Sequence, residues 1–163
     1  MKEVFVKYAA YNFWANKILL GRLVQIPTDV LHKDMGSSFG SIYKTLVHTM
    51  EVESIWWQRI KLAEHVLLPE KDPEEDFEVL SKKIIESSKQ WSDWVSNATE
   101  NNITHVFGYY NTKKAYFKQP VYEVLLHLFN HQTYHRGQII TMLRQSGIDK
   151  IPATDFIVFS RKK

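Results

Sequence analysis

Histidines are the residues of this chain whose type and spacing best indicate chemistry. Three of the seven, His127, His131 and His135, recur every four residues, so on a helix they form one stripe. Two histidines one turn apart can ligate one metal ion. All three cannot share an ion, because His127 and His135 are about 12 Å apart along a helix axis, whereas a Zn–N bond measures about 2.1 Å. One pair is therefore expected to bind, and the spacing leaves open which pair it is.

A site with two ligands on one helix needs a further ligand, and His48 is the strongest candidate elsewhere in the chain. It lies near the middle of a second predicted helix, where an inward side chain reaches the interior of a bundle. Three other histidines lie in a loop or at the ends of elements and are poorer candidates: His32, His65 and His105. The competing interpretation is a set of buried histidines that only form hydrogen bonds. His127 is expected to have a structural role, with Glu123 one turn before it to orient the ring.

Four segments with helical periodicity must position these histidines. They are predicted at about residues 5–24, 39–63, 72–98 and 120–145. Ser37 or Ser38 is expected to cap the second helix. For the third helix, the expected signals are Asp72 at the N-cap, Pro73 at the first helical position and Glu75 to complete a capping box.

The sequence between the third and fourth helices changes to an alternation of period two. The residues that alternate around the turn Asn111-Thr112 are Ile103, His105, Phe107, Tyr109, Ala115 and Phe117. A small hairpin is predicted there, and the apolar tail at 154–159 is expected to pack back onto the helices. The predicted fold class is all-α, a four-helix bundle with a hairpin-like insertion between helices 3 and 4, in a single domain spanning residues 1–163.

Composition excludes several classes of protein. The chain is 44% hydrophobic and 24% charged with a net charge of +3, and its Lys and Arg residues are scattered, so neither disorder nor nucleic-acid binding is expected. No membrane span or leader peptide is expected, which makes the cytoplasm the default location. The absence of cysteine excludes disulfides, thiolate metal sites and a cysteine nucleophile. A ferritin-like di-iron site is also excluded, because the sequence has no Glu-x-x-His motif.

Six blocks of the sequence resemble the DinB/YfiT-like family of candidate metalloenzymes, which are damage-inducible four-helix proteins. The blocks are 11–16 (YNFWAN), 36–42 (GSSFGSI), 45–48 (TLVH), 53–56 (ESIW), 127–138 (HLFNHQTYHRGQ) and 154–157 (TDFI). The resemblance covers nearly the whole chain. It implies a four-helix bundle that binds a divalent metal ion, nickel or zinc, through three histidines, which by motif are His48, His131 and His135. It also implies a homodimer and, for some relatives, a low-molecular-weight thiol as cosubstrate.

Three neutral imidazoles leave a further coordination position for water or substrate, as in catalytic rather than structural metal sites. The first hypothesis is therefore a metal-dependent enzyme, either a thiol-dependent transferase or a hydrolase. Because the chain has no cysteine, any sulfur nucleophile must come from outside. Glu51, one turn after His48, is a candidate general base, and a surface carboxylate is the competing interpretation of it. The alternative hypothesis is a non-catalytic metal-binding protein of the stress or damage response.

Overall fold

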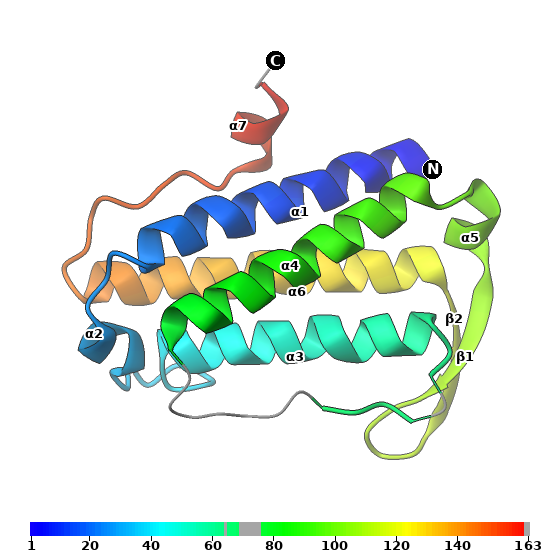
Figure 1. Ribbon diagram of the computed structural model, residues 1–163, viewed down its shortest axis with the longest axis horizontal. Helices are drawn as coiled ribbons and strands as arrows, with labels where there is room; N and C mark the ends of the chain where they lie inside the picture. Colours follow the sequence, from blue (N-terminus) through cyan, green and yellow to red (C-terminus); the bar gives the residue numbers. More distant parts are fainter. Residues whose placement is uncertain (64, 69–75, 162–163) are drawn as a thin grey trace.

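Four long helices form the body of the protein, whose computed structural model describes residues 1–63, 65–68 and 76–161. They are α1 (Lys2–Leu23), α3 (Ile42–Ile60), α4 (Phe77–Asn97) and α6 (Val121–Gln145). Helix α1 packs against α4 and α6, and α3 packs against the same two helices. Figure 1 shows that α1 and α6 run in one direction and α3 and α4 in the opposite one. The predicted four-helix bundle is therefore confirmed.

Shorter elements connect the long helices or follow the last of them. They are α2 (Thr28–His32), α5 (Glu100–Thr104), α7 (Phe156–Ser160) and two strands, β1 (Val106–Tyr110) and β2 (Tyr116–Pro120). The strands pair in antiparallel register, with Gly108 opposite Lys118, which confirms the predicted hairpin. The Asn111 side chain accepts hydrogen bonds from the backbone N–H groups of Lys113 and Ala115 and so closes the turn. Ile103, expected in the first strand, lies instead in α5.

The N-terminal boundary of α3 differs from the prediction. Ser41, not Ser37 or Ser38, caps the helix, because its hydroxyl accepts a hydrogen bond of 3.2 Å from the backbone N–H of Lys44. The reason is a tight turn before the helix, in which the Gly40 N–H donates to the Ser37 carbonyl and Gly40 adopts a φ of +82°. A left-handed backbone favours glycine, so the helix can begin only after this residue.

The N-terminus of α4 is described from Asp76 onward. The Asp76 carboxylate accepts a hydrogen bond of 2.7 Å from the Glu78 N–H, and the helix begins at Phe77. The capping box expected at Asp72, Pro73 and Glu75 lies outside the described residues.

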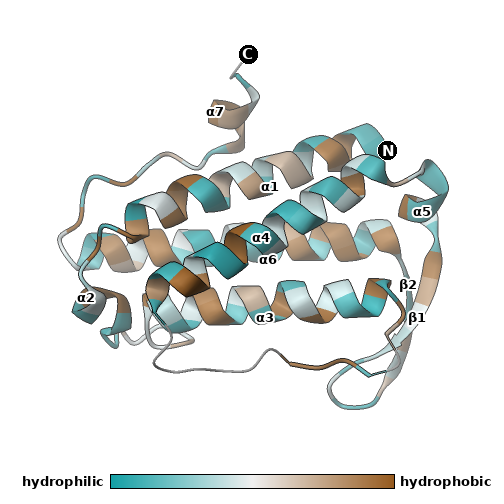
Figure 2. Cartoon of the chain, viewed as in Figure 1, coloured by the Kyte–Doolittle hydropathy of each residue, from teal (hydrophilic) through white to brown (hydrophobic). Residues whose placement is uncertain are grey.

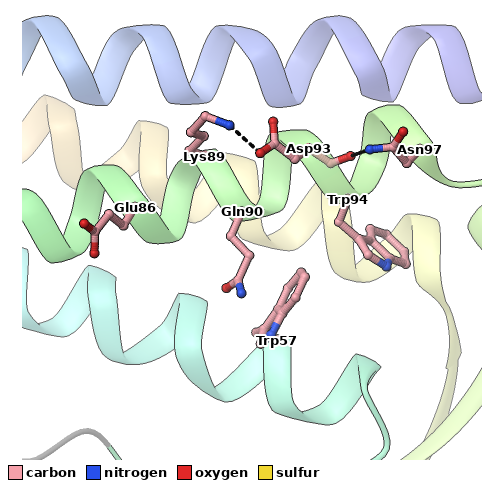
Figure 3. Close-up of a pocket in the computed structure, with 7 residues that line it drawn as sticks. All are labelled: Trp57, Glu86, Lys89, Gln90, Asp93, Trp94 and Asn97. Carbon is pink, nitrogen blue, oxygen red and sulfur yellow. Dashed lines mark hydrogen bonds and ion pairs between the residues drawn. The ribbon is translucent and has the colours of Figure 1, made fainter.

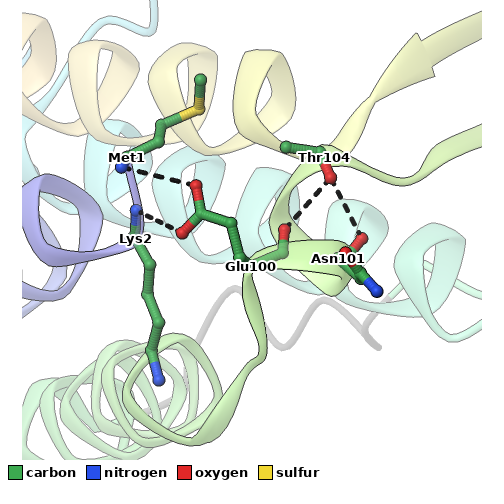
Figure 4. Close-up of polar contacts among 5 residues, drawn as sticks. All are labelled: Met1, Lys2, Glu100, Asn101 and Thr104. Atoms are coloured by element: carbon green, nitrogen blue, oxygen red, sulfur yellow. Dashed lines mark hydrogen bonds and ion pairs between the residues drawn. The ribbon is translucent and has the colours of Figure 1, made fainter.

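Both ends of the chain's described part are anchored to neighbouring elements. Glu100 at the start of α5 accepts a hydrogen bond from the Lys2 N–H and lies 3.4 Å from the Met1 amino group (Figure 4). Near the other end, the Tyr11 hydroxyl donates to the Thr154 carbonyl oxygen at 2.8 Å, and the Phe156 ring packs against the Tyr11 ring. The tail therefore packs onto α1, as the sequence predicts.

Two apolar clusters fill the bundle, one toward each end. The α2-end cluster includes Leu20, Leu31, Leu46, Ile84 and Leu143. The hairpin-end cluster includes Phe5, Trp91, Phe107, Leu125 and Phe129. Hydrophobic and hydrophilic residues alternate along each long helix (Figure 2), as expected for helices with one buried face. Among the described helices, none is long and apolar enough to cross a lipid bilayer.

A layer of buried polar side chains, here called the polar layer, lies between the two clusters. Its members are Asn12 and Asn16 of α1, Glu53 of α3, Ser88 of α4 and Arg136 of α6, and each is at most 4% exposed. One guanidinium nitrogen of Arg136 donates to the side-chain oxygens of Asn12 and Asn16, at 2.6 and 2.8 Å. Asn16 in turn donates to the Ser88 hydroxyl at 2.8 Å, which donates to the Glu53 carboxylate at 3.2 Å. This chain of hydrogen bonds joins all four long helices.

Burial decides the protonation of Glu53. It raises the pKa of the Glu53 carboxyl from 4.5 to about 7, although hydrogen bonds from Ser87 and Ser88 and the positive charge of Arg136 oppose the shift. The folded protein therefore holds the Glu53 proton at pH values where an unfolded chain has released it. Raising the pH through this interval removes stability from the native state, because the unfolded state ionises first.

Replacing Glu53 by Gln is expected to abolish this loss of stability, since an amide does not titrate. With about 1.4 kcal/mol per pKa unit, the stability of Glu53→Gln relative to wild type should increase by about 3 kcal/mol between about pH 5 and pH 8. The measurement is the free energy of unfolding in urea for chelator-treated proteins. Glu86→Gln, at an exposed position of α4, is the control and should show no such trend. A Glu53→Gln effect that is constant with pH would contradict the assignment.

Candidate metal centre

The three histidines expected to bind metal converge in the structure from two neighbouring helices. His48 comes from α3, and His131 and His135 come from consecutive turns of α6. The Nε2 atom of His131 lies 3.0 Å from the Nε2 atoms of both His48 and His135. All three ligand atoms lie within 4.8 Å of one another, so these histidines could hold one metal ion. We call this group the histidine triad.

A buried hydrogen bond holds the two helices in register at the triad. The Gln132 side-chain amide donates to the Thr49 carbonyl oxygen at 3.3 Å, and both residues are 2% exposed. Gln132 directly follows His131 in the chain, and Thr49 directly follows His48. The contact therefore sets the level at which α3 meets α6 and brings the imidazoles together.

Gln138 determines which nitrogen of His135 faces the triad with a free lone pair. The Nδ1 atom of His135 lies 2.7 Å from the side-chain oxygen of Gln138, which can only accept, so Nδ1 carries the proton. The Gln138 amide nitrogen donates to the Tyr134 hydroxyl at 3.0 Å, which is consistent with this orientation of the amide. The neutral His135 ring consequently presents an unprotonated Nε2 to the triad, which is the form that binds a metal.

The spacing of the three nitrogens fits a shared cation better than a hydrogen-bonded group. A single N–H on the Nε2 atom of His131 can donate to only one of its two neighbours, although both are 3.0 Å away. Two nitrogens bound to one ion at about 2.1 Å are about 3.0 Å apart at a right angle and about 3.4 Å apart at a tetrahedral angle. The donor set and the distances therefore both suit a metal ion.

The surroundings of His131 keep its imidazole neutral. Burial is the main cause that lowers the pKa of His131 to about 3, and the nearby His135, His48 and His127 rings contribute to this shift. Burial also lowers the pKa of His135, and the hydrogen bond with Gln138 partly opposes this shift. Neutral imidazole is the ligand form, so the protein presents these two ligands ready for a cation at neutral pH.

Aromatic rings surround the triad on its outer side. The Phe39 ring stacks on His48 with centroids 4.0 Å apart and meets His135 edge-on at 5.5 Å. The His127 ring lies 5.8 Å from the His131 ring and contacts Trp56 at 5.6 Å. His127 is exposed and is not one of the converging ligands.

The remaining candidates lie outside the triad. Glu51 is partly buried on α3, one turn after His48, and does not belong to the converging ligand atoms. The His32 ring stacks on Tyr43, and His65 and His105 are exposed. Sequence reasoning missed the roles of Phe39, Gln132 and Gln138. A glutamine on the buried face of a helix was the available signal, because a buried amide requires hydrogen-bond partners.

Figure 3 shows a surface pocket between α3 and α4 that does not resemble a reactive site. Its volume is about 480 Å³, and it is lined by Trp57, Glu86, Lys89, Gln90, Asp93, Trp94 and Asn97. Lys89 pairs with Asp93, and Asn97 donates to the Asp93 carbonyl oxygen, so these three residues bond to one another. No histidine lines it, and the converging ligands among the described residues lie elsewhere.

Comparisons with known proteins find related sequences and a similar fold. The model of the DinB family matches residues 1–162. Protein DinB of Bacillus subtilis (strain 168) is 29% identical over 165 residues, which cover 96% of this chain and 93% of that protein. The crystal structure of a DinB-like protein of Bacillus subtilis, YjoA, superposes with a TM-score of 0.70 at 15% identity. This superposition covers 91% of this chain and 97% of the other, and it shows a shared fold.

Replacing Gln138 by Leu is expected to weaken metal binding without removing a ligand. The substitution leaves the Nδ1–H of His135 without its acceptor, and loss of such a partner typically costs about 10- to 100-fold in affinity. Competition with a chromophoric chelator at a fixed pH measures the dissociation constant. Gln145→Leu, at an exposed position at the end of the same helix, is the matched control. Equal affinities for Gln138→Leu and wild type would show that Gln138 does not orient the ligand.

Proposed function

The chain belongs to the DinB family, and we propose that it is a metal-dependent enzyme, a thiol-dependent transferase or a hydrolase. The proposed cofactor is one divalent ion held by His48, His131 and His135. The observation that carries the proposal is the convergence of three imidazole nitrogens from two helices that are held in register. Nothing in this arrangement requires a loop to order before the ligands meet.

The family resemblance favours nickel or zinc as the ion, and the donor set is consistent with both. Imidazole nitrogens suit Zn, Ni, Cu and Fe, whereas Mg and Ca prefer carboxylate and carbonyl oxygens. The converging ligand atoms among the described residues include no carboxylate oxygen. Three protein ligands also leave coordination positions for water or substrate, which distinguishes catalytic from structural sites.

The chain's own residues suit the binding of a small molecule beside the triad. A bound divalent ion would supply Lewis acidity, which lowers the pKa of a coordinated water or thiol. Phe39 covers one side of His48 and limits access of bulk water, while His127 and Trp56 offer a polar edge and an aromatic face near His131. Glu51 is the candidate proton acceptor, because it lies one turn from His48 and is partly buried. Since the chain has no cysteine, a thiol would enter as a low-molecular-weight cosubstrate.

Metal content tests the ligand assignment. Replacing His48, His131 or His135 by Ala, one at a time, should reduce the metal content of tag-free protein from one ion per chain to a small fraction. Replacing His127 by Ala should leave the content unchanged, because its ring is not part of the triad. Elemental analysis after dialysis against a weak chelator gives the result. Loss of metal in His127→Ala together with retention in His135→Ala would place the site one helical turn away.

Turnover tests the enzymatic part of the proposal. Wild-type protein loaded with nickel or zinc should consume a low-molecular-weight thiol in the presence of an electrophile, or hydrolyse an ester or amide. His131→Ala, treated identically, should be inactive, because metal cannot be retained by the two remaining ligands. If the protein binds one metal ion per chain but catalyses neither the thiol reactions nor the hydrolysis reactions, the non-catalytic alternative is favoured.

We also propose that the protein forms a homodimer. Support comes from the family resemblance and from partly exposed aromatic side chains on the first two long helices, such as Phe13 and Trp57. Light scattering at micromolar concentration should give twice the chain mass of 19.2 kDa. A mass of one chain across the whole concentration range would contradict the dimer.

A further inference from the structure

A second cavity, here called the hairpin pocket, lies between the end of α3, the residues that follow it (62–63 and 65–68) and the β1–β2 hairpin. Its volume is about 700 Å³, which is within the range of small-molecule sites. Its walls combine aliphatic side chains, among them Ile55, Val66 and Leu68, with the aromatic ring of Tyr109. The pocket therefore offers both apolar surface and the volume needed by a small organic ligand.

The charged groups of the hairpin pocket have one sign. Arg59 and Lys114 line it, and its lining includes no carboxylate among the described residues. An arginine and a lysine, with no carboxylate in the described part of the lining, produce a positive potential inside a partly enclosed cavity. An anion is consequently the chemical class of ligand that this cavity favours.

Arg59 is held in place by two aromatic rings, and the described lining of the pocket offers it no carboxylate. Its guanidinium carbon lies 4.7 Å from the centre of the Trp56 ring and 5.0 Å from that of Tyr109, so two aromatic rings fix it. Its Nε is buried and has no hydrogen-bond partner among the described residues. Burial lowers the pKa of Arg59, because a charge that is partly removed from water is destabilised. A stacked guanidinium keeps its in-plane N–H groups available, which is the geometry that binds a carboxylate with two hydrogen bonds.

We propose that the hairpin pocket binds a small organic acid. The carboxylate pairs with Arg59, assisted by Lys114, and the apolar or aromatic body lies against Tyr109 and the aliphatic wall. The apolar lining distinguishes this ligand from an inorganic anion, which would leave that surface in water.

The hairpin pocket is separate from the histidine triad. Arg59 is three turns beyond His48 on α3, about 16 Å along the helix axis, and neither His131 nor His135 lines the cavity. Trp56 lies between the two places, since its ring contacts both Arg59 and the His127 ring. The proposal does not depend on a metal ion, so it can be tested on metal-free protein.

The test compares 2-naphthoate with 2-naphthamide, a neutral molecule of the same shape, by calorimetry on chelator-treated protein. Wild type should bind the acid at least tenfold more tightly than the amide. Arg59→Gln should lose this preference, whereas Arg144→Gln, at an exposed position of α6, should keep it. Chelator treatment prevents the carboxylate from binding a metal at the triad, so a failure here is independent of the proposed metal function.

Two further measurements are needed. The first tests the effect of the pocket's charge without changing its packing, and the second tests whether the ligand is organic or inorganic. Lys114→Gln, in the exposed hairpin turn, cannot disturb the core and should weaken naphthoate binding severalfold. Inorganic phosphate should displace naphthoate poorly at equal concentration. Equal binding of acid and amide by wild type, or an unchanged preference in both Arg59→Gln and Lys114→Gln, would overturn the proposal. Phosphate binding as tight as that of naphthoate would show that the ligand class is wrong.

Discussion

The polar layer halfway along the bundle is the constraint on which the rest of the structure depends. A buried donor or acceptor left without a partner costs about 1–3 kcal/mol, and more if it is charged. Arg136 can donate to Asn12 and Asn16 only if α1 and α6 keep one relative position along the bundle axis. The contact between Ser88 and Glu53 sets the same requirement for α3 and α4. Apolar contacts alone would tolerate small sliding movements of the helices, whereas these hydrogen bonds do not.

The histidine triad lies at the same level as the polar layer, and this shared level explains its geometry. Arg136 directly follows His135 in α6, so the residue that fixes the helix in the core adjoins a ligand of the triad. A site built on rigid helices is more precise than one built on loops. Because the two apolar clusters form a core of their own, we expect the fold to form without metal, unlike that of a zinc finger.

The parts of the structure that follow from local patterns could be predicted from the sequence. The four long helices follow from their periodicity and the hairpin from its alternation around Asn111, while the ligand pair on α6 follows from its spacing together with the family resemblance. The parts that depend on packing could not. Ser41 caps α3 because Gly40 adopts a left-handed backbone, and serine alone does not reveal that. The partners of Glu53 and Arg136 lie on other helices, so the sequence alone did not reveal the network that they form.

The division of the core by the polar layer also determines what spectroscopy can observe. Trp91 belongs to the hairpin-end cluster, and Trp56, Trp57 and Trp94 pack against it, whereas no tryptophan belongs to the α2-end cluster or packs on it among the described residues. Intrinsic fluorescence therefore reports mainly on one half of the molecule. If the α2 end opens by itself, the emission will change little while the far-ultraviolet circular dichroism falls, so agreement between the two signals is a direct measure of how cooperatively the halves unfold.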